Sequence, residues 1–296
     1  MKTRILIIAL ILTGFGCGKN KRNVEASGAF EATEVIVSAQ AGGQLIYFNV
    51  DEGQTLIAGQ TLGVVDTMQL YLKKAQLLAS MKAVDSRAYN VALQVASLKQ
   101  QLAKQQTELA RFQNLLRANA ATQKQVDDIQ AQIDVLQKQL NAQTANLENN
   151  NRSVSGESAA LQIQIEQVED LICKSKIISP IDGTVLSKYT EAGEVTAAGK
   201  ALFKVGDLNN MYLRAYITAD QLTQLKLNQK VKVWVDFGKK EMKEYEGTIT
   251  WIADKAEFTP KNIQTKNERA NQVYAMKVAV RNDGFLKIGM YGEVGN

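Results

Sequence analysis

The chain has 296 residues, of which 45% are hydrophobic and 22% are charged, a balance typical of a folded protein. It contains no histidine, which excludes histidine general bases, Ser-His and Cys-His nucleophiles and most zinc sites. The formal net charge is +5, two of these charges lie in the first 16 residues, and aromatic residues make up only 6%. We therefore expect that the protein is not an enzyme and that it has no metal site, no cofactor and no nucleic-acid partner.

The first 16 residues have the pattern of a signal peptide. Lys2 and Arg4 form a positive start, and residues 5–12 are an apolar run well short of the roughly 20 residues of a membrane-spanning helix. Cys17 follows a glycine, which resembles the lipobox of bacterial lipoproteins, although another glycine stands where an aliphatic residue is usual. The resemblance implies a lipid on Cys17 and a tether over residues 17–27. An ordinary signal peptide with an incidental cysteine is the alternative.

A pattern of three glycines occurs twice, about 140 residues apart. Each copy has the form G-x9-G-x5-G, with a short apolar stretch after the last glycine. Since glycine adopts positive φ at little cost, two equal spacings indicate two copies of one turn-rich β unit. We expect these units over residues 28–66 and 173–207, as the halves of one β module opened by an insertion. The glycines are Gly43, Gly53 and Gly59 in the first copy and Gly183, Gly193 and Gly199 in the second.

The insertion, residues 67–172, carries apolar residues at a seven-residue step. In its first half, two rows are offset alternately by four and three residues, which is the pattern of a coiled coil. The step resumes after a break at 117–123 and runs from Val126 to Val168. We therefore expect an antiparallel hairpin with its tip at that break, each helix being about 50 residues and about 75 Å long. The sequence NLENNNRSVSG, residues 146–156, has low helix propensity, so we expect a bend or frayed turn there.

Residues 208–296 change to short runs in which apolar and polar residues alternate, as in half-buried strands. One short helix is expected within residues 218–227. Several short antiparallel strands with one helix fit a small β-barrel. We expect Trp234 and Trp251 to fill its interior.

Two long segments carry a resemblance to the HlyD-type periplasmic adaptors, also called membrane fusion proteins. One is KIISPIDGTVLSKYTEAGEVTAAGKALFKVGDLNNMYLRAYI, in and after the second glycine copy. The other is AEFTPKNIQTKNERANQVYAMKVAVRNDGFLKIGMYGEV, near the end of the chain. Within it, the FTP turn, Arg269, Val273 and Tyr274 resemble the subgroup that serves ABC exporters.

The resemblance covers residues 28–295 and implies an elongated α+β multidomain fold. Its parts would be a split lipoyl/biotinyl-like β domain, a long antiparallel coiled-coil α-hairpin, and a small antiparallel β-barrel at residues 208–296. The chain extends little beyond that barrel, so we expect the membrane-proximal domain of many such adaptors to be reduced or missing.

The same resemblance implies a role. Such adaptors link an inner-membrane transporter, here of the ABC type, to a TolC-type outer-membrane channel. At the expected tip, Arg111, Leu115 and Thr122 resemble the arginine, leucine and serine with which the family meets the channel. The family also implies a hexameric ring in the periplasm of a Gram-negative bacterium, held at the inner membrane by a lipid on Cys17.

Two other readings remain open. One is a structural coiled-coil protein of the periplasm without a transport partner. The other is an acyl or carboxyl carrier, because lipoyl-type domains display a modified lysine on a turn between their two halves. Here the hairpin begins at that point, at Asp66-Thr67-Met68, and Lys73 and Lys74 are expected on a solvated helix face.

Overall fold

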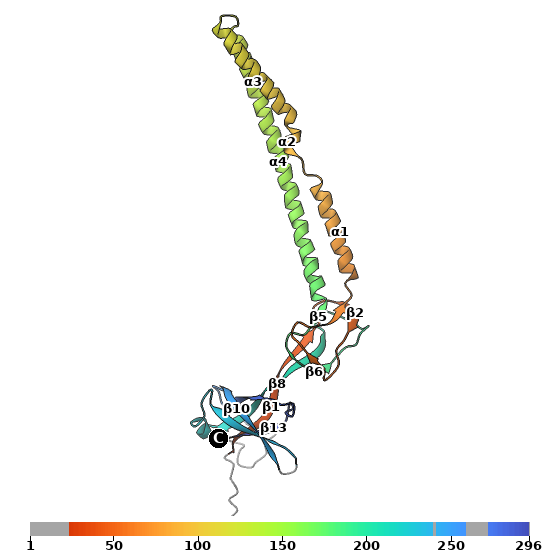
Figure 1. Ribbon diagram of the computed structural model, residues 1–296, viewed down its shortest axis with the longest axis vertical. Helices are drawn as coiled ribbons and strands as arrows, with labels where there is room; N and C mark the ends of the chain where they lie inside the picture. The colour runs from red at the N-terminus through yellow and green to blue at the C-terminus, as the bar shows by residue number, and fades with distance from the viewer. Residues whose placement is uncertain (1–23, 239–240, 259–271, 296) are drawn as a thin grey trace, which may run out of the picture.

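The computed structural model describes residues 24–238, 241–258 and 272–295. Cys17, the expected signal peptide, Arg269, and Thr259 and Pro260 of the FTP segment lie outside these residues. The described chain is elongated, with a β-barrel, a second β domain and a helical hairpin following one another along the long axis (Figure 1). In the part described, no helix is long and apolar enough to span a membrane.

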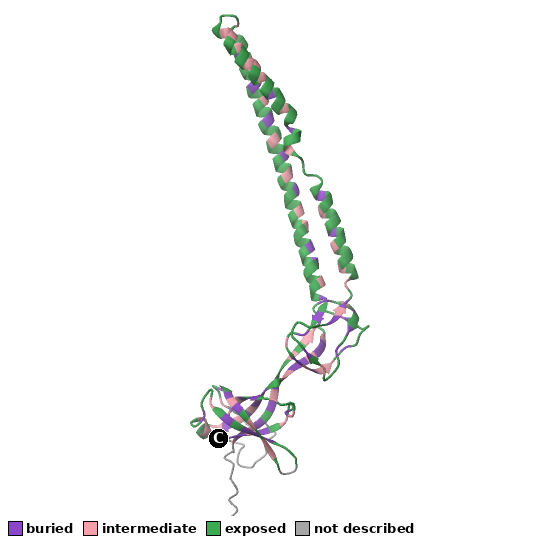
Figure 2. Cartoon of the chain, in the orientation of Figure 1, coloured by how far each residue is buried: buried purple, intermediate pink, exposed green. Residues whose placement is uncertain are grey.

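The hairpin is built from four helices. The ascending side contains α1 (Met68–Asp85), α2 (Val91–Gln94) and α3 (Ala96–Arg117), and the descending side is the single helix α4 (Gln123–Lys174). The seven-residue step predicts the buried side of α4, except that Ile165 is buried where the step places Leu161, which is half-buried. Buried residues recur along it as narrow bands while the other faces are exposed (Figure 2). They are Val126, Ile133, Leu140, Leu147, Val154, Ile165 and Val168.

The interruption in the hairpin is on the opposite side from the one predicted. Residues 146–156 lie within the unbroken helix α4, whereas the ascending side leaves the helical conformation between α1 and α2. The physical reason is a contact across the hairpin. The side chain of Asn151 accepts a hydrogen bond from the Tyr89 backbone N–H (2.8 Å) and donates one to the Tyr89 carbonyl (2.8 Å). Asn151 therefore stabilises the break on the ascending side of the hairpin, and its own helix α4 stays unbroken.

The split β domain is completed by strands from both ends of the insertion. Strand β3 (Thr55–Leu56) pairs with β6 (Gly183–Lys188), and β4 (Thr61–Val65) pairs with β5 (Lys176–Ile178). Strand β2 (Gly43–Phe48) pairs with β4 of its own half and with β7 (Val195–Thr196) of the other. One cluster of buried side chains joins the halves, including Leu45, Leu56 and Leu62 from the first and Val185, Leu202 and Val205 from the second. Neither half has a complete sheet or core alone.

The repeated glycines do not all serve the same purpose. Gly53, Gly59, Gly193 and Gly199 have φ between 81° and 90°, in the left-handed region that favours glycine. Gly183 has no such φ, and its role is close packing. A Cβ atom built on it would lie 2.6 Å from the Gly206 carbonyl oxygen.

The barrel closes through six strands in the order β8, β12, β10, β9, β13, β1 and back to β8. Their bounds are β1 Val24–Ser38, β8 Ala201–Thr218, β9 Lys230–Asp236, β10 Met242–Ile252, β12 Gln272–Arg281 and β13 Tyr291–Gly295. Helix α5 (Ala219–Leu222) is the expected short helix, and β11 (Glu257–Phe258) pairs with the start of β12. The interior is packed by residues such as Phe30, Leu213, Ile217, Val233, Ile249 and Val278.

The prediction that both tryptophans fill this interior is wrong. Trp251 is 40% exposed. Trp234 is buried, but Val233 and Val235 on either side of it belong to the interior cluster, so Trp234 points to the other face of β9. Its indole N–H donates to Glu244 Oε2 at 3.0 Å.

Two long strands run through both β domains. The first part of β1 pairs with β13 and with Met211–Tyr216 of β8 in the barrel, while residues 33–38 pair with residues 201–207 of β8 in the split domain. The register shifts between these parts, at Ala32 and Thr33. The boundary expected at residue 28 therefore lies inside β1, because one strand serves both cores.

Candidate functional site: the hairpin tip

The tip is a short turn that is closed by hydrogen bonds at both ends. Helix α3 ends at Arg117, and Asn119 takes a left-handed conformation with φ of 56°. The Asn119 N–H donates to the Leu116 carbonyl (3.0 Å) and the Ala120 N–H to the Leu115 carbonyl (2.9 Å). This pair of bonds is the Schellman arrangement, which satisfies carbonyls left without partners at a helix end. The turn is therefore well defined, and it fixes how α3 passes into α4.

Thr122 begins the descending helix. Its hydroxyl accepts a hydrogen bond from the Gln125 N–H (3.3 Å), and the Gln125 side chain accepts one from the Thr122 N–H (2.9 Å). This reciprocal pair is a capping box. The hydroxyl that resembles the family's serine thus has a structural role within the chain, and the residue is exposed.

Arg111 and Leu115 lie one helical turn apart on α3 and so share a face. The Arg111 side chain is 70% exposed, and its ion pair with Glu108 is long, at 3.7 Å. An exposed pair of this kind contributes little, so the guanidinium remains accessible to acceptors on another molecule. Leu115 is half-buried. The structure therefore offers a cationic fork beside an apolar side chain, next to a rigid turn.

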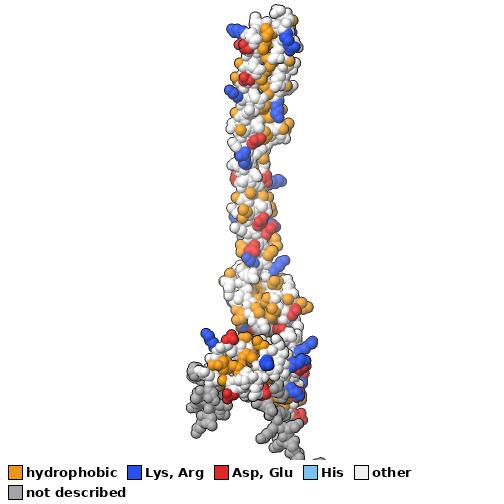
Figure 3. All heavy atoms as spheres, turned by 90° about the vertical axis from the view of Figure 1, so that its left-hand side faces the viewer, with side chains coloured by type: hydrophobic (Ala, Val, Ile, Leu, Met, Phe, Trp, Pro, Cys, Tyr) orange, Lys and Arg blue, Asp and Glu red, His pale blue; other side chains and the backbone are white. Residues whose placement is uncertain are grey.

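Other tip residues were not singled out from the sequence. Asn119 determines the turn, and its signal was an asparagine between alanines, because asparagine tolerates the left-handed conformation better than most residues. Arg117 and Lys124 are also exposed near the turn. Lys and Arg side chains stand out around the tip with hydrophobic side chains between them (Figure 3). Arg117 and Lys124 thus add two basic groups at the turn, and the exposed Asp127 and Asp128 follow them in α4.

The base of the hairpin is where a carrier domain would present its lysine. Strand β4 leads through Asp66 and Thr67 directly into α1. Lys73 is exposed on that helix, and Lys74 forms an ion pair with Glu169 of α4 at 2.7 Å. The hydrogen bond to Glu169 raises the pKa of Lys74, which keeps it charged. This ion pair links α1 to α4 near the base of the hairpin.

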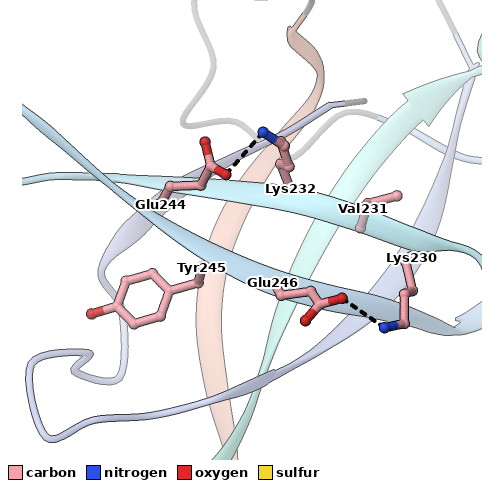
Figure 4. Close-up of a pocket in the computed structure, with 6 residues that line it drawn as sticks. All are labelled: Lys230, Val231, Lys232, Glu244, Tyr245 and Glu246. Carbon is pink, nitrogen blue, oxygen red and sulfur yellow. Dashed lines mark hydrogen bonds and ion pairs between the residues drawn. The ribbon is translucent and has the colours of Figure 1, made fainter.

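A hollow of about 500 Å³ lies on the outside of the barrel, over β9 and β10 (Figure 4). Two cross-strand ion pairs line it, Lys230 with Glu246 (2.8 Å) and Lys232 with Glu244 (3.0 Å). Since these charges offset each other, the hollow offers no net charge to a ligand. Among the described residues, no group of His, Cys, Asp or Glu is placed to hold a metal ion.

A second charged cluster joins the β9–β10 end to the loop before β13. Lys243 pairs with Asp283, and its ammonium lies 5.2 to 5.6 Å from the ring centroids of Phe237, Tyr245 and Phe285. The hydrogen bond from Lys243, aided by the Phe285 N–H, lowers the pKa of Asp283 to about 2. These contacts fasten the β9–β10 end to the loop before β13.

Known proteins share the sequence pattern of this chain over most of its length. The family model described as RND MFP, barrel-sandwich hybrid domain, matches residues 33–207. A UPF0194 membrane protein of Citrobacter koseri is 27% identical over 284 residues, covering 89% of this chain and 85% of the relative. The UPF0194 membrane protein YbhG of Salmonella gallinarum is 26% identical with the same coverage.

Two solved structures share the fold. The crystal structure of MacA from Actinobacillus actinomycetemcomitans has a TM-score of 0.54 and 20% identity, covering 92% of this chain and 77% of that one. A MacA-MexA chimeric protein, which contains the MexA α-hairpin domain of Pseudomonas aeruginosa, has a TM-score of 0.53 and 22% identity, covering 92% and 82%. These likenesses concern the elongated arrangement of split β domain, hairpin and barrel.

Proposed function

This chain belongs to the membrane fusion protein family whose members carry a barrel-sandwich hybrid domain of the RND type, and from this membership we propose that it is the periplasmic adaptor of a tripartite efflux or secretion system. In this role it links an inner-membrane transporter to a TolC-type outer-membrane channel. The observation that carries the proposal is the family match over the split β domain and the hairpin that interrupts it. The role requires no bond chemistry, no cofactor and no metal.

The tip is the proposed contact with the channel. Arg111 would donate to carbonyl oxygens exposed at a helical turn of the channel, since a guanidinium presents several donors in a fixed fork. Leu115 would supply an apolar anchor beside it, and Thr122 would hold the turn that positions both. Arginine and apolar anchors at the centre of a small contact commonly carry much of its affinity.

The remaining partners rest on the sequence resemblance. An ABC-type transporter is favoured by the FTP turn with Arg269, Val273 and Tyr274. The split β domains of neighbouring copies would pack side by side in a ring of six, and a lipid on Cys17 would hold the ring at the periplasmic face of the inner membrane. The barrel would then meet the transporter.

The test of this function uses charge reversal at the tip. Arg111→Asp should abolish crosslinking to the outer-membrane channel and reduce export to the level of the deletion strain, because it replaces the donor fork with an acceptor. Lys104→Asp, an exposed lysine one heptad below, is the matched control and should leave both unchanged. Unchanged crosslinking and export in Arg111→Asp would show that the tip does not dock as proposed.

The two alternative readings have separate tests. A structural coiled-coil protein would show no export defect when its gene is deleted. A carrier protein would show a lipoyl or biotinyl adduct on a lysine in the intact mass of the purified chain. Either result would overturn the adaptor proposal.

A further inference from the structure

The ascending side of the hairpin is interrupted about halfway up. Helix α1 ends at Asp85, the chain runs without helix to Asn90, and the Asn90 side chain then caps α2 by accepting from the Leu93 N–H (3.3 Å). A second irregularity follows at Val95, where φ is −99° and ψ is 4°. Figure 1 shows this link between α1 and α2 beside the continuous helix α4. At this height the hairpin has only one helix.

The apolar core of the hairpin is divided at the same height. An upper cluster contains Val95, Leu102, Ile133, Leu140 and Leu147, and a lower cluster contains Leu77, Ile165 and Val168. Val84 and Val154 lie between them, are buried, and belong to neither cluster. The upper and lower parts of the hairpin are therefore packed as two units.

Polar contacts connect the break to α4. They are the paired hydrogen bonds of Asn151 to the Tyr89 backbone and an ion pair from Arg87 to Glu157 at 2.6 Å, in which both side chains are about half exposed. Hollows of about 360 and 450 Å³ flank the break, so side chains do not fill the space around it. Exposed ion pairs contribute little to stability, so Asn151 is the main tie among these polar contacts.

Helix α4 is intrinsically weakest opposite the break. Residues 149–156 include three asparagines, two serines and Gly156, all of which favour the helix less than alanine does. A Cβ atom on Gly156 would meet nothing within 4 Å, so packing does not require glycine there. Bends in helices concentrate at serine and glycine. The helical conformation is thus interrupted on the ascending side of the hairpin and intrinsically weak on the descending side at the same level.

From these features we propose that the break at residues 86–90, together with residues 149–158 of α4, is an elbow at which the upper hairpin tilts relative to the lower one. Asn151 is the positioning residue that holds the observed arrangement. The elbow is independent of the identity of any transport partner. In an adaptor, it would let the tip move sideways while the β domains stay in place.

Distances between spin labels test the elbow directly. Labels at Gln143→Cys and Gln167→Cys span it along α4, and labels at Lys124→Cys and Glu148→Cys have the same separation of 24 residues, about 36 Å, within the upper unit. All four positions are exposed, and the full chain would carry Cys17→Ser and Cys173→Ser. We expect a wider distance distribution for the spanning pair. Equal widths would overturn the proposal.

Two substitutions should change the flexibility of the elbow in opposite directions. Asn151→Leu removes the tie and should widen the spanning distribution further, while Asn149→Leu, an exposed neighbour, should not. Gly156→Ala strengthens the helix without a clash and should narrow the distribution even if Asn151→Leu impairs folding. If Asn151→Leu behaves like Asn149→Leu and Gly156→Ala has no effect, the elbow does not exist.

Discussion

At Gly183 the backbone of β6 lies directly against the backbone of β8. A Cβ atom there would be 2.6 Å from the Gly206 oxygen and 2.9 Å from its carbonyl carbon, and neither backbone atom can move aside as a flexible side chain could. Gly193 is different, since a Cβ atom would meet nothing within 4 Å but φ is 90°. Two glycines of the same repeat unit are thus required for different reasons, close packing at Gly183 and backbone conformation at Gly193.

This difference gives a prediction at the residue scale. Gly183→Ala should lower the free energy of unfolding by about 1–3 kcal/mol through overpacking, and Gly193→Ala by about 1–2 kcal/mol through backbone strain. Asparagine, which tolerates positive φ, should recover part of the loss at residue 193 and none at residue 183. Chemical denaturation of the four variants measures this. Recovery by asparagine at both positions would contradict the packing role of Gly183.

At the scale of the element, the tip is determined by its two caps. Asn119 ends α3 and Thr122 starts α4, so the turn has little freedom, and Arg111 and Leu115 are presented from a fixed frame. Because the Thr122 hydroxyl accepts the Gln125 N–H, a loss of function on changing this residue has two possible origins. Substitutions can separate them.

Thr122→Ala should destabilise the helix start by about 1 kcal/mol because the cap is lost. Thr122→Asn should keep the stability, since asparagine caps as well as threonine, while removing the hydroxyl. Thermal unfolding and crosslinking to the channel are measured together on both variants. If Thr122→Asn is stable and still crosslinks, the residue acts through the cap; if it is stable and fails to crosslink, the hydroxyl itself contacts the channel.

At the scale of the whole molecule, the hairpin is an insertion whose two ends meet. The Val65 N–H donates to the Ser175 carbonyl at 2.9 Å, which places the end of β4 beside the end of α4. The strands on either side then pair across the insertion, and β1 and β8 continue into the barrel. The β part of the molecule therefore depends on the hairpin for continuity of the chain and not for its core.

A chain in which residues 68–174 are replaced by a short Gly/Ser linker should therefore fold. We expect a β-rich circular dichroism spectrum and a single cooperative unfolding transition. As a control, a chain ending at Lys174 keeps the whole first half but lacks its partner strands, and it should not fold. A molten spectrum for the first chain would mean that the hairpin contributes to the β core.

Much of this architecture was readable from local patterns. The seven-residue step on α4 predicted most of its buried residues, since burial along a helix repeats with its own period, but it missed Ile165. The paired glycine spacings predicted the two matching β units. At the tip, the sequence predicted where the helices turn and offered Arg111 and Leu115, but the caps made by Asn119 and Thr122 appear only in the folded turn.

What the sequence determined alone was the order of parts: a β unit, a heptad hairpin, a second β unit and a run of short strands. Tertiary structure decided where the hairpin breaks, because the Asn151 side chain bonds to the backbone of Tyr89, which lies 62 residues away in the sequence on the opposite side of the hairpin. It also decided that β1 serves two cores, and that Trp251 faces outward. Such features depend on which segments meet in space, and no local period or propensity carries that information.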